Sequence, residues 1–153
     1  MKKGAAKLRL FKKTVYGYYK NHRRDFPWRK TRDPYRILIS EIMLQQTQVS
    51  RVTLKYDEFI RAFPDFASLA RAPLRYILKK WSGLGYNRRA LYLKQIAEKV
   101  IKVYRGRLPI DTEALRTLPG IGDATASSIA AFAFNAPEVF IETKIVQIAL
   151  KDA

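Results

Sequence analysis

The sequence predicts an all-α fold, and three observations support this fold class. Apolar residues recur at helical spacing through most of the 153 residues. Prolines and glycines interrupt this pattern at short intervals, as they do between consecutive helices. No stretch shows the sustained alternation of apolar and polar residues that is typical of a strand. Because 48% of the residues are hydrophobic, the chain can bury a core and a folded domain is expected.

The first 34 residues are predicted to form a basic N-terminal arm. An amphipathic helix is expected over residues 5–20, where apolar side chains recur among lysines on one helix face. A loop follows from residue 22 to residue 34 and contains two prolines and five basic residues. This arm is interpreted as part of a single domain that spans residues 1–153.

A helical core is predicted over residues 35–134. Asp33 and Pro34 provide an N-cap and a first-turn proline for its first helix. Pro64 and the turn 82–85 are predicted to separate later helices. The helices expected in this core cover residues 35–46, 49–63, 66–71, 74–81, 86–104, 112–115 and 125–134. The C-terminal segment 135–153 is expected to contain one more helix, over residues 141–150.

The charge of the chain indicates a polyanionic partner. There are 30 Lys and Arg against 13 Asp and Glu, which gives a formal net charge of +17. The excess is uneven, because residues 1–36 carry 13 of the basic residues and only 2 of the acidic ones. This asymmetry favours nucleic acid as the partner, ahead of an anionic membrane surface. The alternative is a basic surface that serves only solubility.

The composition excludes several classes of site within this chain. It has no cysteine, which rules out a disulfide framework, a thiolate zinc site and a Cys-ligated iron–sulfur cluster. Its single histidine disfavours histidine metal sites and a Ser-His-Asp triad. No apolar run is long enough to span a bilayer, and no signal peptide is recognised. A cytoplasmic, nucleoid-associated and monomeric protein is therefore expected.

A tight turn at residues 118–122, Leu-Pro-Gly-Ile-Gly, is the first feature that suggests chemistry. Gly120 and Gly122 allow the backbone to turn closely and to direct N–H groups outward at a helix N-terminus. Such N–H groups bind phosphate, and the outward carbonyls could hold a monovalent cation beside it. The alternative is an ordinary corner between two helices.

Glu41 is the second feature, because it is the only carboxylate in the apolar run 37–44. A carboxylate that is desolvated on such a helix has its pKa raised and can serve as a proton donor. The alternative is that Glu41 faces solvent or pairs with Arg36. The polar residues that follow, Gln45 to Gln48, suit hydrogen bonds to base edges, although they also suit a polar helix end.

A second carboxylate, Glu142, is the third feature. Two acids can divide the work of a bond cleavage, since one protonates the leaving group and the other stabilises positive charge. Glu41 and Glu142 lie about a hundred residues apart in the chain. Sequence alone therefore leaves their pairing as a hypothesis.

Five motifs follow one another along the chain: Pro-Trp-Arg at 27–29, Asp-Pro-Tyr at 33–35, Ser-Glu-Ile-Met-Leu-Gln-Gln-Thr-Gln-Val at 40–49, Trp-Ser-Gly-Leu-Gly-Tyr at 81–86 and the turn at 118–122. In this order they resemble the catalytic domain of adenine DNA glycosylases of the MutY type, within the helix-hairpin-helix glycosylase superfamily. The resemblance extends over about residues 8–150. The block at 40–49 is specific to this family, whereas the turn 118–122 is shared by the wider superfamily.

The resemblance implies a role for each matching position. Glu41 would protonate N7 of adenine, and Glu142 would stabilise the oxocarbenium ion at the sugar. The family has Asp at the position of Glu142, and Lys144 also departs from its pattern, which predicts reduced activity. Gln46 and Tyr86 would insert beside the lesion base and help the duplex to open. The residues expected to contact the base or the DNA are Arg24, Trp28, Arg29, Gln45, Gln46, Tyr86, Leu118, Gly120, Ile121 and Gly122.

The resemblance also implies the reaction and its limits. Ala124 stands where strand-cutting relatives have lysine, so a monofunctional hydrolase is expected. Its substrate would be double-stranded DNA with adenine opposite guanine or 8-oxoguanine, in base excision repair. Two rivals remain open: a thymine or uracil mismatch glycosylase, and a DNA-binding remnant with impaired catalysis.

Family members usually continue into a four-Cys iron–sulfur loop and a domain that recognises 8-oxoguanine. This chain is interpreted as a truncated gene product, a fragment or a minimal form, with an incomplete second lobe and no cofactor of its own. Because C-terminal helices cover the N-terminal helix in the family, the apolar face of residues 5–20 is expected to be partly exposed here.

Overall fold

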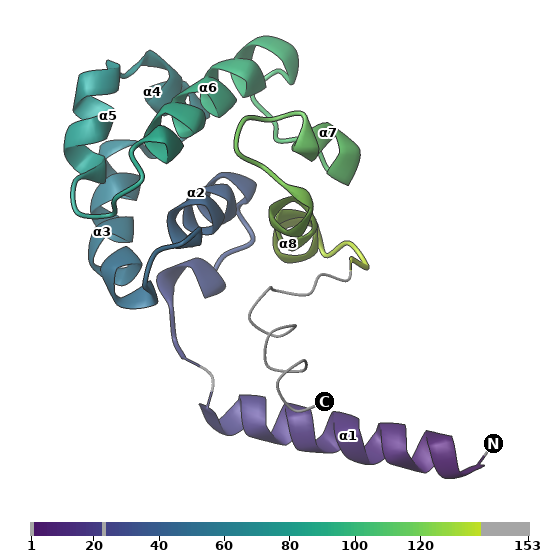
Figure 1. The fold of residues 1–153 in the computed structure, drawn as a ribbon. Helices are drawn as coiled ribbons and strands as arrows, with labels where there is room; N and C mark the ends of the chain where they lie inside the picture. Colours follow the sequence, from purple (N-terminus) through teal and green to yellow (C-terminus); the bar gives the residue numbers. More distant parts are fainter. Residues whose placement is uncertain (1, 23, 139–153) are drawn as a thin grey trace.

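A computed structural model describes residues 2–22 and 24–138, and all regular structure in these ranges is helical. The all-α prediction is therefore confirmed (Figure 1). The helix expected over 141–150 lies outside the described residues. The elements are α1 (Lys2–His22), the 3-10 helix η1 (Pro27–Arg29), α2 (Pro34–Leu44), α3 (Val49–Ala62), α4 (Phe66–Arg71), α5 (Leu74–Trp81), α6 (Arg88–Val103), α7 (Thr112–Arg116) and α8 (Asp123–Phe134).

Helix α2 lies at the centre of the core, between α8 on one side and α3 and α6 on the other (Figure 1). Its first turn is capped as predicted, because the Asp33 carboxylate accepts hydrogen bonds from the Tyr35 and Arg36 N–H groups. Seven of its eleven residues are buried. A helix that is apolar on nearly all sides needs partners around it, and the surrounding helices supply them.

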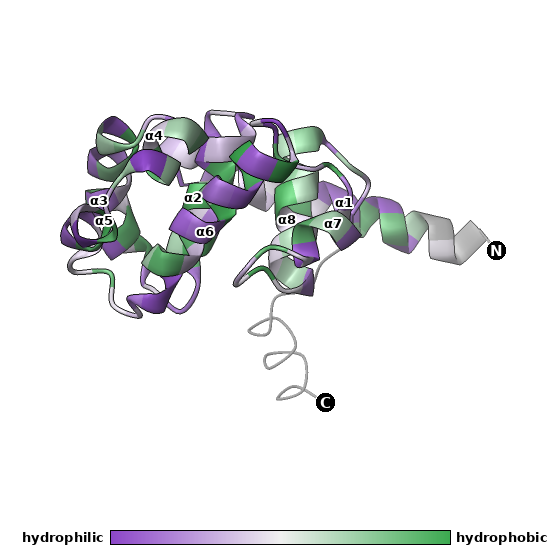
Figure 2. Cartoon of the chain, turned by 90° about the horizontal axis from the view of Figure 1, so that it is seen from above, coloured by the Kyte–Doolittle hydropathy of each residue, from purple (hydrophilic) through white to green (hydrophobic). Residues whose placement is uncertain are grey.

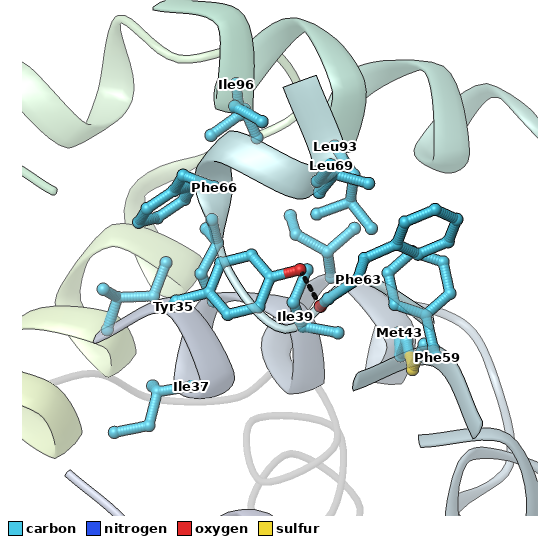
Figure 3. Packing of buried hydrophobic residues seen from close by; sticks show 14 of the residues in the cluster. Tyr35, Ile37, Ile39, Met43, Phe59, Phe63, Phe66, Leu69, Leu93 and Ile96 are labelled. Carbon is cyan, nitrogen blue, oxygen red and sulfur yellow. Dashed lines mark hydrogen bonds between the residues drawn. The ribbon is translucent and has the colours of Figure 1, made fainter. Parts of the chain in front are cut away.

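Aromatic residues connect α2 to the helices that follow it (Figure 3). The Tyr35 hydroxyl donates a hydrogen bond of 2.6 Å to the carbonyl of Phe63, just after α3. The Tyr35 ring also packs edge to face against Phe66 on α4. These contacts fix α2 against the α3–α4 connection, with the Glu41 end of the helix directed away from them.

Two helix limits that differ from the predicted ones involve residues expected to contact the base or the DNA. Helix α2 ends at Leu44, so Gln45 and Gln46 lie in a turn and not in the expected helix 35–46. Helix α6 begins at Arg88, so Tyr86 lies in the preceding turn and not in the expected helix 86–104. The predicted helices at 66–71 and 74–81 are confirmed residue for residue.

Helix α1 extends away from the other helices (Figure 2). The side chains described for it are exposed, including Leu10 at 66% and Phe11 at 65%. The prediction that an apolar face of residues 5–20 is exposed is therefore confirmed. Among the described helices, none is long and apolar enough to cross a membrane.

Candidate functional site

A cavity of about 740 Å³ opens where α2, α8 and the segment around η1 meet. Helix α2 and the turn after it form one wall, and the first half of α8 forms the opposite wall. Cavities of this size are typical of small-ligand sites. The lining residues are Arg24, Phe26, Trp28, Arg29, Glu41, Leu44, Gln45, Gln46, Thr47, Gln48, Val49, Ala124, Thr125 and Ser128.

Glu41 lines this cavity with a half-buried side chain. Ser128 on α8 contacts it directly, since the Ser128 Oγ lies 2.6 Å from the Glu41 Oε2. The same Oγ lies 3.0 Å from the backbone carbonyl of Thr125. Glu41 is therefore positioned from across the cavity by a residue that is 87 positions away in sequence.

Gln45 connects α2 to the predicted phosphate-binding turn. Its side-chain Nε2 donates to the carbonyl of Gly120 at 3.0 Å and to the Thr125 hydroxyl at 3.2 Å. The amide hydrogens of Gln45 are thus directed at the protein. Any contact of this residue with a ligand would go through its carbonyl oxygen or follow a rearrangement.

Gln46 and Tyr86 share an unusual backbone conformation. Their φ angles are +53° and +48°, in the left-handed region that non-glycine residues rarely adopt. Both side chains are exposed, Tyr86 at 63%. Such backbone strain is often found at functional sites, where surrounding contacts hold it in place. The two residues that the resemblance places beside the lesion base are therefore both held at exposed, strained turns.

Arg89 holds these two turns together, and sequence reasoning did not identify it. Its guanidinium donates to the carbonyls of Ile42, Met43 and Gln45 and, on the other side, to the Thr47 hydroxyl and the carbonyls of Leu84 and Gly85. Burial lowers the pKa of Arg89, although nearby Tyr86 opposes this effect. Because these bonds satisfy the last carbonyls of α2, they also explain why the helix ends at Leu44.

The turn 118–122 combines a buried face with an open one. Leu118 and Ile121 are buried, and the Ile121 N–H donates to the Leu118 carbonyl, so their side chains belong to the core. Gly120 has a φ of +74°, and a Cβ there would collide with the Tyr92 ring. A Cβ at Gly122 would meet nothing within 4 Å. Gly122 is the N-cap of α8 and has no side chain, so the first-turn N–H groups of this helix receive no cap from it.

The basic segment before α2 forms the remaining wall of the cavity. Trp28 is buried, stacks on Phe26 at 4.9 Å and meets Tyr56 edge to face at 5.2 Å. Arg24 lies over the Phe26 ring, and both Arg24 and Arg29 are exposed. These two arginines give this part of the cavity a positive charge.

Glu142 lies outside the described residues, so its pairing with Glu41 stays a prediction. The described residues contain no group of three or more His, Cys, Asp or Glu side chains that could hold a metal. Because the sequence has no cysteine, its residues do not fit an iron–sulfur cluster. The monovalent cation at the turn 118–122 stays a prediction.

Sequence reasoning did not identify Ser128 or Arg89, although each has a feature in the sequence that could have indicated it. Ser128 is a polar residue within the Ala-rich apolar run of α8, much as Glu41 is within its own run. Arg89 falls on the same helical stripe as the buried residues Leu93, Ile96 and Val100. A basic residue on an apolar stripe needs buried acceptors, and this requirement predicts a structural role.

Comparison with known proteins agrees with this architecture. A family model described as HhH-GPD superfamily base excision DNA repair protein matches residues 39–148. A thymine/uracil-DNA glycosylase of Methanothermobacter thermautotrophicus is 36% identical over 143 residues, which are 93% of this chain and 65% of that protein. An adenine DNA glycosylase of Buchnera aphidicola is 37% identical, again over 93% of this chain but 41% of the relative.

A solved structure of a thermostable thymine-DNA glycosylase has the same fold. It superposes with a TM-score of 0.87 at 36% sequence identity, and the match covers 95% of this chain and 67% of that one. The chain thus spans less than two thirds of the length of these two curated relatives. Relatives with different base specificities are similar to it to almost the same degree.

Proposed function

The chain belongs to the HhH-GPD superfamily of base excision DNA repair proteins, and from this premise we propose that it is a monofunctional DNA glycosylase. Its proposed substrate is double-stranded DNA with adenine opposite guanine or 8-oxoguanine. The reaction is hydrolysis of the bond that joins the base to the sugar. Ala124, at the position of the strand-cutting lysine of some relatives, supports hydrolysis without strand cleavage.

The observation that carries this proposal is the position of Glu41. It lines a cavity that is large enough for a nucleobase and that two arginines also line, and it lies within hydrogen-bond distance of Ser128. A general acid must lie within reach of the atom that it protonates, and a base flipped into this cavity would meet that condition.

The proposed chemistry begins with proton transfer from Glu41 to N7 of the flipped adenine. The C1′–N9 bond then breaks, its electron pair leaves with the adenine, and the sugar becomes an oxocarbenium ion. Water adds to C1′ and releases a proton. Glu142 is the proposed second carboxylate that stabilises the sugar cation.

DNA binding in this proposal relies on three surfaces. The first-turn N–H groups at Gly122 would hold a backbone phosphate, and the open space at this glycine would let the phosphate approach closely. Gln46 and Tyr86 would enter the duplex beside the lesion base and help adenine to flip out. The net charge of +17 would draw the phosphate backbone to the protein from a distance.

A thymine or uracil mismatch glycosylase is the second candidate. The observation in its favour is the 36% identity to a thymine/uracil-DNA glycosylase, which matches the 37% identity to an adenine DNA glycosylase almost equally. The amide of Gln45 does not favour adenine, because it is directed at the turn 118–122 and at Thr125.

The first experiment is a single-turnover assay of base release. The intact chain and its Glu41→Gln variant are incubated with duplexes that contain adenine opposite 8-oxoguanine, adenine opposite guanine, or thymine or uracil opposite guanine. We expect adenine release by the intact chain and a loss of at least roughly a hundredfold in the variant, because removal of a general acid has effects of this size.

Other results would redirect the proposal. Release of thymine or uracil alone would support the second candidate. No release from any duplex, together with binding that weakens steeply between 50 and 200 mM salt, would identify a DNA-binding remnant. Release that is unchanged in Glu41→Gln would show that another residue is the acid.

A further inference from the structure

We propose that Ser128 is a positioning residue that holds the Glu41 carboxyl group through its hydroxyl in both the protonated and the ionised state. This inference rests on the proposed function of Glu41 as the proton donor. Its basis is the geometry between α2 and α8: the Ser128 Oγ lies 2.6 Å from the Glu41 Oε2 and 3.0 Å from the Thr125 carbonyl, and Ser128 is buried.

The two short contacts cannot both be donated by Ser128, because its hydroxyl carries a single hydrogen. With Glu41 ionised, the hydroxyl donates to the carboxylate. With Glu41 protonated, the Glu41 O–H can donate to the Ser128 Oγ while the Ser128 hydroxyl turns to the Thr125 carbonyl. The Thr125 carbonyl is therefore the alternative acceptor for the Ser128 hydrogen. It lets Ser128 switch from donor to acceptor in its bond with Glu41 without a movement of its oxygen.

The hydrogen bond between Ser128 and Glu41 differs in strength between the ionised and the protonated state of Glu41. A hydrogen bond to an ionised carboxylate is roughly twice as strong as one between neutral groups. Ser128 therefore stabilises the state of Glu41 that follows proton transfer more than the state that precedes it, because its alternative bond goes to a Thr125 carbonyl that already accepts a hydrogen bond within α8, and such a back-bond adds little. The expected result is a lower pKa of Glu41 and faster proton donation to the base.

Charged groups also lie on the described elements around Glu41. Arg24 and Arg29 line the same cavity, and Arg36 lies on α2 itself. Arg89 on α6 binds carbonyls at the end of α2, and Asp123 at the start of α8 is paired with Arg116. The residues of α3 and α8 that line the cavity, Val49, Ala124, Thr125 and Ser128, are uncharged.

The test compares Ser128→Ala with Ser127→Ala. Both substitutions remove one hydroxyl from α8 and introduce the residue with the highest helix propensity, so neither is expected to unfold the protein. Ser127 is a matched control, because its Oγ is directed at Glu138 and not at Glu41. All of the charged groups around Glu41 are unchanged in both variants.

The first readout does not depend on activity. The pKa of the Glu41 side-chain carboxyl group is measured by a ¹³C NMR titration of the full chain, assigned with Glu41→Gln. We expect this pKa to be about one pH unit higher in Ser128→Ala than in the intact chain and unchanged in Ser127→Ala. The same pKa in all three proteins would overturn the inference, whatever the outcome of the base-release assay.

The second readout is the pH profile of single-turnover base release. We expect Ser128→Ala to be roughly threefold to tenfold slower at its optimum, with a deficit that shrinks as pH rises along the alkaline limb. The deficit shrinks because the weaker acid stays protonated to higher pH. A deficit that is equal at every pH would indicate only a structural effect and would contradict the inference. If the intact chain releases no base, the proposed function fails, and the titration alone decides on Ser128.

Discussion

At the scale of single residues, the two glycines of the turn 118–122 serve different purposes. Gly120 has a positive φ and lies against the Tyr92 ring, so the fold itself requires a glycine there. Gly122 has ordinary backbone angles and open space where a Cβ would lie. The protein's own packing does not require glycine at position 122, which agrees with close approach of an outside group.

Gly120→Ala and Gly122→Ala should therefore separate folding from binding. Gly120→Ala is expected to lower the free energy of unfolding by about 2 kcal/mol or more, because it combines backbone strain with a clash. Gly122→Ala should cost less than about 1 kcal/mol, the size of an N-cap effect, but weaken duplex binding severalfold. Urea denaturation and a DNA-binding titration measure the two effects. Equal losses of stability would contradict this assignment.

At the scale of elements, Arg89 links the end of α2 to the turn before α6. One terminal nitrogen donates to carbonyls at the end of α2, and the other donates to carbonyls in the turn before α6. The guanidinium also lies 5.1 Å from the Trp81 ring centroid and 5.5 Å from that of Tyr86. The planar guanidinium is suited to this geometry, because it presents donors in a fixed fork. The turns of Gln46 and Tyr86 are therefore held at a fixed distance from each other.

Arg89→Met should destabilise the protein on the order of 3 kcal/mol, since it leaves several buried carbonyls without a donor. Arg89→Lys is expected to recover only part of this loss, because an ammonium group cannot span both turns. Arg88→Met is the matched control, as Arg88 is the exposed neighbour on the same helix. Urea denaturation of the three variants tests the prediction. If Arg89→Met is as stable as Arg88→Met, the link between the turns is not structural.

At the scale of the whole molecule, two buried tyrosines make the stability of the folded protein depend on pH in the alkaline range. Burial is the main cause that raises the pKa of Tyr35 well above its usual range and that of Tyr56 to about 12. Both hydroxyls donate to backbone carbonyls, Tyr35 to Phe63 and Tyr56 to Arg36. The folded core therefore favours the neutral phenols.

Stability should consequently fall as pH rises above about 10. In the unfolded chain both tyrosines ionise near pH 10, whereas in the folded protein they keep their protons to higher pH. The contribution of the two tyrosines to the free energy of unfolding is complete below pH 10. It is lost above this pH, at about 1.4 kcal/mol per pH unit for each tyrosine. Urea denaturation between pH 9 and 11.5 measures this slope.

Tyr35→Phe tests the source of this pH dependence. It should flatten the alkaline slope by about one proton, while Tyr16→Phe on the exposed face of α1 leaves the slope unchanged. The Tyr35 variant should also lose about 1 kcal/mol at neutral pH, because the Phe63 carbonyl loses its donor. A slope that is the same in both variants would assign the alkaline loss of stability to other groups.

The sequence by itself determined the fold class and most helix limits. Periodic apolar positions, the cap at Asp33 and the breaks at prolines act locally, so they can be read from neighbouring residues. Two of the limits that were wrong, at Gln45 and Tyr86, lie where Arg89 supplies donors from another part of the chain. Local propensity does not contain that information.

The tertiary structure alone decided what surrounds Glu41. The sequence indicated Glu41 as an acid in an apolar run, but not its neighbour Ser128, which lies 87 residues later. It also suggested Gln45 as a ligand contact, whereas the packing of α2 against α8 directs its amide to Gly120 and Thr125. Hydrogen bonds between distant residues depend on how helices dock, because a side chain reaches only the partners that packing brings within about 3 Å.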